Sequence, residues 1–136
     1  MIASLLQLTR SDMRALRIKD AYSIHRVVYD LFEDIRTEDE KGGSITSGIL
    51  FVDKGGDALQ RSVMIVSKRH PREPEFGEIS SKTIPSDFLT HSEYRFEVVV
   101  NPTKRNRDTG RTAAVRGAGD IAAWFLERAE ESFGLS

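Results

Sequence analysis

The chain is organised around a helix that is predicted to begin at Asp20-Ala21-Tyr22-Ser23-Ile24-His25-Arg26. Asp20 is a suitable N-cap, because its carboxylate can accept hydrogen bonds from free backbone N–H groups of the first turn. At about 100° per residue, the apolar residues that follow form one stripe that can face a core. The stripe consists of Ile24, Val27, Val28, Leu31, Phe32 and Ile35. The helix is expected to end near Arg36.

A second lane of the same helix carries groups that can take part in chemistry. Tyr22, His25 and Tyr29 follow i, i+3, i+7 spacing, which places an imidazole and two phenols at the edge of the apolar stripe. By pattern alone, the ordinary interpretation is a packed rim between core and solvent. The alternative is a site of proton transfer, because an imidazole titrates near neutral pH.

The composition limits the classes of protein to which the chain can belong. Its 136 residues are 39% hydrophobic and 30% charged, which is typical of one soluble globular domain and excludes a disordered chain. No apolar run approaches the ~20 residues that a membrane span requires. The absence of cysteine excludes disulfides and thiolate metal sites and agrees with a reducing cytoplasm. The three histidines lack metal-ligand spacing, so we expect no metal and no cofactor.

The charge distribution singles out one segment. The net charge is −1, yet residues 101–116 hold five cations against the single anion Asp108. The cations are Lys104, Arg105, Arg107, Arg111 and Arg116. Such a segment on a neutral body can bind a polyanion locally, and the alternative is an ordinary solvated loop.

Five segments have the apolar patterns of β-strands. They are Ile2–Thr9, Gly48–Val52, Arg61–Val66, Glu78–Ile84 and Tyr94–Val100. The last is the strongest, because it alternates at first and then becomes fully apolar, as a strand buried on both faces does. Glu78–Ile84 is predicted to be a short edge strand.

The remaining segments are assigned as connections or as a second helix. The connections are Ser11–Lys19, Thr37–Ser44, the turn Lys54–Asp57, the proline-containing Lys68–Gly77 and the basic loop Thr103–Gly119. Asp120 is expected to cap the second helix, whose apolar face includes Trp124, and Gly134 is expected to end it.

This order of elements is the ferredoxin-like βαββαβ arrangement without its last strand. We therefore expect an α+β fold, with two helices on one face of an antiparallel sheet, over residues 1–136 as a single domain. The missing strand would lie beside the first, so Ile2–Thr9 is expected to present an unpaired edge. The chain is then either the N-terminal part of a longer protein or forms a homodimer through that exposed edge.

Three segments together resemble the N-terminal half of the CasE-type CRISPR-associated endoribonucleases of the RAMP superfamily. Residues 20–26 are similar to the family's D-x-Y-x-x-H-R helix start, and residues 96–105 to its F-x-x-x-x-N-P-T-K-R strand and basic turn. Residues 121–128 are similar to its A-x-W-L-x-R helix. The resemblance spans nearly the whole chain in the right order, although nothing matches the family's second ferredoxin-like domain, which has a glycine-rich loop near the C-terminus.

The resemblance implies a metal-independent nuclease that cuts precursor CRISPR RNA within its repeats. It implies that His25 is the catalytic histidine, that Tyr22 assists it, and that Lys104 and Arg105 meet the RNA backbone. We add Arg26 as a backbone contact, and Arg107, Arg111 and Arg116 as weaker candidates. The implied partners are a repeat RNA hairpin and the subunits of a CRISPR effector complex.

Two other interpretations remain open from the sequence. One is a non-catalytic, RNA-binding subunit of a CRISPR ribonucleoprotein complex, in which Tyr22 and His25 stack on RNA or form a rim. The other is a regulatory ferredoxin-like domain that binds a small ligand, with the basic segment as an anion site. It is disfavoured because no glycine-rich phosphate motif leads from a strand into a helix.

Overall fold

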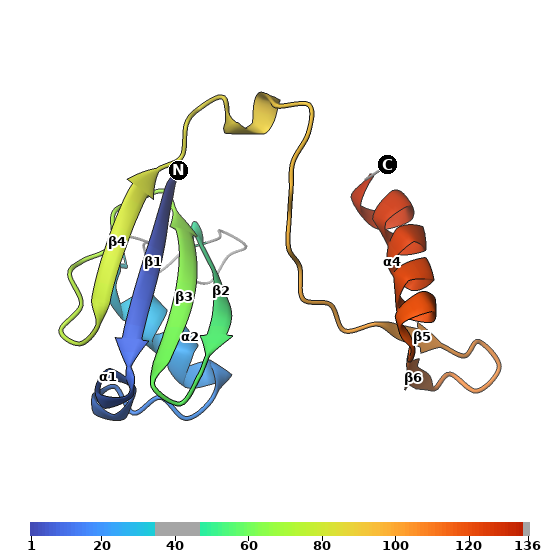
Figure 1. Ribbon diagram of the computed structural model, residues 1–136, viewed down its shortest axis with the longest axis horizontal. Coiled ribbons are helices and arrows are strands. Elements are labelled where there is room, and N and C mark those ends of the chain that lie inside the picture. Colours follow the sequence, from blue (N-terminus) through green and yellow to red (C-terminus); the bar gives the residue numbers. More distant parts are fainter. Residues whose placement is uncertain (35–46, 135–136) are drawn as a thin grey trace. The chain divides into compact units, whose positions relative to one another are not determined.

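The computed structural model describes residues 1–34 and 47–134, which divide into two compact units, Met1–His91 and Ser92–Ser136. The elements are drawn in Figure 1, and each unit is described by itself. No helix within the described ranges is long and apolar enough to cross a membrane.

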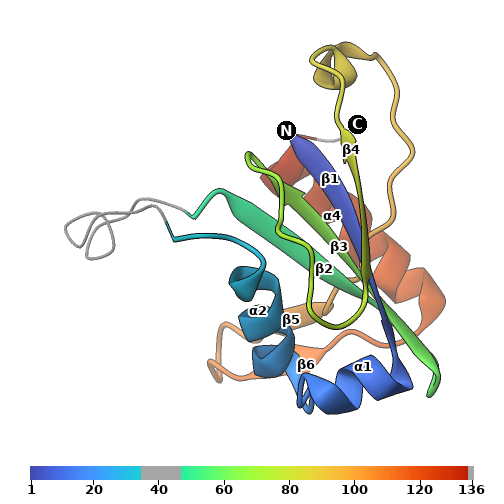
Figure 2. The ribbon, with the colours of Figure 1, turned by 90° about the vertical axis from the view of Figure 1, so that its left-hand side faces the viewer.

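The first unit is built on a four-stranded antiparallel sheet in the order β2-β3-β1-β4. The strands are β1 (Ile2–Thr9), β2 (Ile49–Gly56), β3 (Gln60–Ser67) and β4 (Glu78–Thr83). The helix α2 (Ala21–Asp30) lies across one face of this sheet, as Figure 2 shows. The predicted α+β, ferredoxin-like class is confirmed, and β4 is the edge strand that was expected.

The prediction that Ile2–Thr9 presents an unpaired edge is wrong. β1 pairs with β3 on one side and with β4 on the other, so that Leu6 lies opposite both Val63 and Ile79. The turn before β4 depends on Gly77, whose φ is +99° and whose missing Cβ would lie 2.6 Å from Leu8 Cδ2. Glycine tolerates both the positive φ and the close contact, so the chain can turn tightly against the end of β1. The homodimer stays a prediction, but β1 is not an edge strand through which it could form.

The helix α1 (Arg10–Ala15) occupies part of the segment that was expected to be a connection. It begins directly at the end of β1 through a capping box. The backbone N–H of Thr9 donates to the Asp12 carboxylate at 2.8 Å, and the N–H of Asp12 donates to Thr9 Oγ1 at 3.2 Å. Since both groups satisfy otherwise free donors, the box stabilises a helix of only six residues.

The predicted start of α2 is confirmed, and its end comes earlier than expected. Asp20 Oδ1 accepts from the backbone N–H of Ser23 at 2.8 Å and from its hydroxyl at 2.7 Å. The helix ends at Asp30, although Leu31 and Phe32 remain buried beyond it. Residues 35 and 36 lie outside the described residues.

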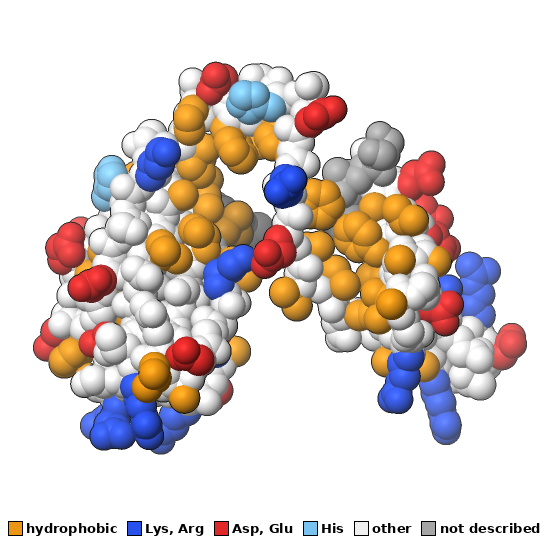
Figure 3. Space-filling model, in the orientation of Figure 1, with side chains coloured by type: hydrophobic (Ala, Val, Ile, Leu, Met, Phe, Trp, Pro, Cys, Tyr) orange, Lys and Arg blue, Asp and Glu red, His pale blue; other side chains and the backbone are white. Residues whose placement is uncertain are grey.

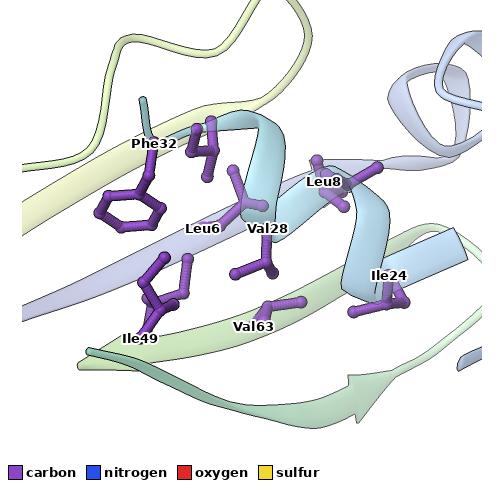
Figure 4. Close-up of a cluster of buried hydrophobic side chains, with 10 residues drawn as sticks. Leu6, Leu8, Ile24, Val28, Phe32, Ile49 and Val63 are labelled. Carbon is purple, nitrogen blue, oxygen red and sulfur yellow. The ribbon is translucent and has the colours of Figure 1, made fainter. Parts of the chain in front are cut away.

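The core of the first unit lies between α2 and the sheet. Ile24 and Val28 point from α2 toward Leu6, Leu8 and Val63 on the strands, as Figure 4 shows. Leu6, Leu8, Val28 and Val63 are fully buried. This packing fixes the rotation of α2 about its axis and therefore determines which of its side chains face solvent.

The hairpin of β2 and β3 is tighter than predicted. Both strands extend beyond the expected residues, so that Lys54, Gly55 and Gly56 belong to β2 rather than to a long loop. The carboxylate of Asp57 closes the short turn by accepting from the backbone N–H groups of Leu59 and Gln60 at 2.7 and 2.9 Å. An aspartate that accepts from residues two and three positions ahead replaces a longer loop here.

The second unit does not contain the strand that was predicted most strongly. Residues 94–100 have no regular structure and nearly all of their side chains are exposed, with Val99 at 90%. No strand in the described part of the chain pairs with this segment. A β pattern in the sequence requires a neighbouring strand before it can form a ladder.

The predicted basic loop is instead a hairpin that leads into a helix. β5 (Thr103–Arg105) pairs with β6 (Thr112–Ala114), and α4 (Ala118–Phe133) follows. The N-cap of α4 is Gly117 rather than Asp120, which lies in the first turn. Gly134 ends the helix in the left-handed conformation, as expected. A short 3₁₀ helix, η1 (Phe88–Thr90), precedes this unit.

Candidate functional site

Three aromatic rings form a nearly parallel stack along α2. The imidazole of His25 lies 4.2 Å from the ring of Tyr29 at an interplanar angle of 13°. On its other side the ring of Tyr22 lies at 6.4 Å and 5°. The spacing of the predicted lane is therefore present in three dimensions, with the histidine between two phenols.

The stack runs from the core toward solvent. Tyr29 is half-buried, and its hydroxyl shares a hydrogen bond of 2.9 Å with Ser47 Oγ. His25 is exposed, and Tyr22 is exposed to 77%. The inner ring is thus anchored, and it stacks on an imidazole that is exposed to solvent.

Two residues of this site were missed in the sequence. The ring of Phe51 on β2 meets the imidazole edge-on, at 5.9 Å and 68°. Ser47, just before β2, holds the Tyr29 hydroxyl. Both lie more than 15 residues from α2 in sequence, so only the packing of β2 beside α2 brings them together. The alternating pattern of β2 was the one signal that Phe51 faces the same side as the core residue Ile49.

Arg26 has a structural partner in addition to its predicted role. Its Nη2 donates a hydrogen bond of 2.7 Å to the carbonyl oxygen of Leu16, the C-cap of α1. A cation at a helix C-terminus also interacts favourably with the helix dipole. Arg26 therefore joins α2 to α1, while the residue as a whole remains exposed.

The predicted basic residues lie on the hairpin and the helix start of the second unit. Lys104 and Arg105 are on β5, Arg107 lies in the turn, Arg111 follows the turn, and Arg116 precedes α4. All five are exposed. The Arg105 Nε donates to the carbonyl of Gly110 at 3.2 Å, so this side chain also holds the turn of the hairpin.

The structure brings Lys104 and Arg116 together around a cavity of about 550 Å³ at the N-terminus of α4. Gly117 provides no side chain to cap the helix, which leaves first-turn N–H groups for another acceptor. The positive end of the helix dipole adds to the two cations, while Asp120 at the rim opposes them. This arrangement suits an anionic group such as a phosphate.

One hydrogen bond joins two of the elements that line this cavity. The indole Nε1 of Trp124 donates to the carbonyl of Thr103 at 3.0 Å, which holds α4 beside β5. Trp124, which was predicted to lie on the apolar face of this helix, is half-buried. Among the described residues no group of three or more His, Cys, Asp or Glu side chains could hold a metal ion.

Comparison with known families gives one match over residues 2–136, to the family described as CRISPR associated protein. Comparison with curated proteins gives no match. Solved structures, including the following two, also share the fold. The first is CRISPR endoribonuclease Cse3 bound to 19 nt RNA, with a TM-score of 0.58, 17% identity, and coverage of 96% of this chain and 68% of that one.

The second is the CRISPR-associated protein Cas6e from Escherichia coli str. K-12, with a TM-score of 0.51 and 16% identity. The match covers 95% of this chain and 64% of that one, so the chain spans about two thirds of the length of both structures. At these identities the likeness shows a common fold, while the family match covers nearly every residue. The chain therefore belongs to the family of CRISPR-associated proteins.

Proposed function

We propose that this chain is the N-terminal part of a two-domain endoribonuclease that cuts precursor CRISPR RNA within its repeats. The observation that carries this proposal is the exposed imidazole of His25, whose ring plane is held by Tyr29 and Phe51. An oriented and accessible imidazole suits general acid or base catalysis. The family match and the Cse3 structure with bound RNA support RNA as the substrate.

The proposed reaction is an internal transfer of the phosphate and requires no metal. The 2′-oxygen attacks the adjacent phosphorus and loses its proton, while the bond from phosphorus to the 5′-oxygen breaks and that oxygen gains a proton. The products are a 2′,3′-cyclic phosphate and a 5′-hydroxyl. His25 performs one of the two proton transfers. Tyr22 positions the imidazole or donates to the phosphate.

The basic residues of the second unit are proposed to bind the RNA backbone. Lys104 and Arg116, which line the cavity at the start of α4, are the strongest candidates on geometry. Arg105 follows, although it also holds the hairpin turn. Arg107 and Arg111, at the turn itself, are proposed as weaker contacts. The partners are a repeat RNA hairpin and the other subunits of a CRISPR effector complex, in the cytoplasm.

The experiment is a cleavage assay with a labelled repeat hairpin in EDTA. The His25→Ala variant is expected to cut roughly 10²–10⁴-fold more slowly, because one proton transfer loses its catalyst. His70→Ala is the matched control, since it removes an exposed histidine from the proline-containing loop. An RNA without the 2′-hydroxyl at the cut site should remain intact. Unchanged cleavage by His25→Ala would contradict the assignment.

A non-catalytic RNA-binding subunit is the second candidate. The observation in its favour is the ring of Tyr22, which is 77% exposed at the outer end of the stack and offers a surface on which a base can lie. In that case the chain binds the repeat RNA without cutting it. Chelator-resistant cleavage that leaves a 2′,3′-cyclic phosphate distinguishes the nuclease from this alternative.

A further inference from the structure

A second cavity lies in the first unit, bounded by α2, the end of α1 and the proline-containing loop before β4. Its volume is about 500 Å³, within the range of pockets that hold small molecules. Leu16, Val27 and Phe76 give it apolar walls. Charged groups of both signs surround these walls, among them Arg17 and Arg26.

Arg17 is held in a backbone conformation that favours glycine. Its φ is +54°, and it is the only non-glycine residue in the described part of the chain with a positive φ. It follows the C-cap of α1, where the N–H of Ile18 donates to the carbonyl of Met13 and the N–H of Arg17 to that of Arg14. Helices commonly end in this way with glycine at the position of Arg17. An arginine at this position carries a cost in backbone strain, and its side chain lines the cavity.

This end of the first unit is also basic. Figure 3 shows Lys and Arg side chains gathered where α1 lies. The exposed cations of α1 and of the segment after it are Arg10, Arg14, Arg17 and Lys19. The two carboxylates of the same segment are engaged as helix caps, Asp12 with Thr9 and Asp20 with Ser23. Of these four cations, only Arg17 lines the cavity.

Arg26 connects this cavity to the ring stack. It lines the cavity and follows His25 directly on α2, so the two side chains leave the helix about 100° apart. Its hydrogen bond to Leu16 holds it over the end of α1. An RNA strand positioned at His25 therefore has the cavity within reach on the same helix.

We propose that this cavity binds one unpaired nucleotide of the RNA that flanks the scissile phosphate. The base lies against Leu16, Val27 and Phe76, and Arg17 binds its phosphate. Carboxylates at the rim, including Asp30 and Glu73, accept from base N–H groups and repel the dense phosphates of a duplex. The nucleotide is unpaired, because only an unstacked base presents its face to a protein wall. This proposal rests on the proposed function of His25.

The test compares Arg17→Gly with the natural chain in equilibrium binding, by fluorescence anisotropy. One RNA is a repeat hairpin with single-stranded flanks, the second is the same hairpin with the flanks removed, and the third has abasic flanks. Arg17→Gly is expected to bind the flanked RNA roughly tenfold more weakly, because a charge-assisted phosphate contact is lost. The slope of log affinity against log salt should fall by about 0.7. The trimmed hairpin should bind equally to both chains.

The same variant also shows whether the fold is preserved. Glycine suits the left-handed position, so the melting temperature of Arg17→Gly should equal or exceed that of the natural chain. Arg14→Ala is the matched control, because it removes the same charge from α1 without touching the cavity, and it should change affinity less than twofold. Abasic flanks should bind more weakly than natural ones, since the apolar walls then lose the base.

Equal weakening of flanked and trimmed RNA by Arg17→Gly would overturn the proposal, because the arginine would then act as a general surface charge. So would unchanged affinity for the flanked RNA. The proposed function is judged separately by cleavage. If Arg17→Gly behaves as expected while His25→Ala still cuts, the cavity stands and the catalytic assignment fails. If His25→Ala is inactive while Arg17→Gly binds normally, only the cavity proposal fails.

Discussion

Trp124 Nε1 donates a hydrogen bond of 3.0 Å to the carbonyl oxygen of Thr103, and this contact ties α4 to β5. Lys104 follows Thr103 directly and therefore lies beside the first turn of α4, where it lines the cavity with Arg116. The indole thus acts on the basic cavity without being part of it. This hydrogen bond links a helix to a strand of only three residues. Its loss should therefore disturb the positions of the cations that line the cavity.

Trp124→Phe should weaken RNA binding several-fold without changing the net charge. Phenylalanine keeps most of the apolar contact but cannot donate to Thr103, so β5 is held less firmly against α4. Faster amide hydrogen exchange in residues 103–114 should accompany the loss. Leu126→Ala, on an exposed position of the same helix, is the control and should leave both quantities unchanged.

Lys104→Ala should weaken RNA binding more than Arg107→Ala does. Lys104 lies in the cavity at the positive end of α4, whereas Arg107 lies in the hairpin turn outside the residues that line it. Each lost phosphate contact lowers the salt slope by about 0.7 on single strands. Binding measured between low and moderate salt checks this. Equal effects of the two variants would show that the cavity gives no advantage over a solvated turn.

Tyr29→Leu should slow RNA cleavage roughly tenfold while leaving RNA affinity unchanged. The substitution removes the ring that stacks on His25 at 4.2 Å, and such aromatic contacts contribute about 0.5–1.5 kcal/mol. Tyr29→Phe keeps the ring and loses only the hydrogen bond to Ser47, so it should retain most of the activity. Single-turnover rates and binding measured on both variants separate orientation of the imidazole from substrate binding.

The capped starts of α1 and α2 should make the first unit sensitive to acid. Hydrogen bonds from the hydroxyl and the backbone N–H of Ser23 lower the pKa of Asp20, and contacts with Thr9 lower that of Asp12. A carboxylate whose pKa is lower in the folded state stabilises the fold at neutral pH. This contribution declines as the pH falls below about 5, through the ordinary carboxyl range and then the lowered pKa.

Asp20→Asn tests this dependence, because asparagine can still accept from the first turn but does not titrate. The free energy of unfolding, measured in denaturant at pH 7, 4 and 3, should fall less steeply with acid in the variant. Asp108→Asn, in the hairpin turn of the second unit, serves as the control. If the free energy of unfolding falls equally with acid in Asp20→Asn and in the natural chain, the result would count against the role of the cap.

The features that could be predicted from the sequence are those decided locally. The Asp20 cap and the lane of Tyr22, His25 and Tyr29 depend on one helix and its first turn, and the structure has them as expected. The apolar stripe is present on the helix as Ile24, Val27 and Val28, while Leu31 and Phe32 are buried beyond its end. The capping box of α1 is equally local, but it was missed because Thr9 ends a strand and caps a helix at once.

Several of the errors concern interactions between distant segments. Residues 94–100 have the pattern of a buried strand, yet a strand requires a partner that no pattern within the segment can provide. The position of β4 beside β1 depends on Gly77 and the course of the loop before it. Phe51 joined the candidate site only through the packing of β2 beside α2.

The central place of β1 has a consequence for synthesis on the ribosome. β1 is translated before both of its neighbours, and the pairing Ile2 with Thr83 joins residues 81 positions apart. Until residues 60–83 emerge, the backbone groups on both edges of β1 have no strand to pair with, so the nascent segment is open to pairing with other chains. The sheet then closes through non-local contacts, which form slowly. Cells that produce this protein should therefore need chaperones most during the interval between the translation of β1 and that of β4.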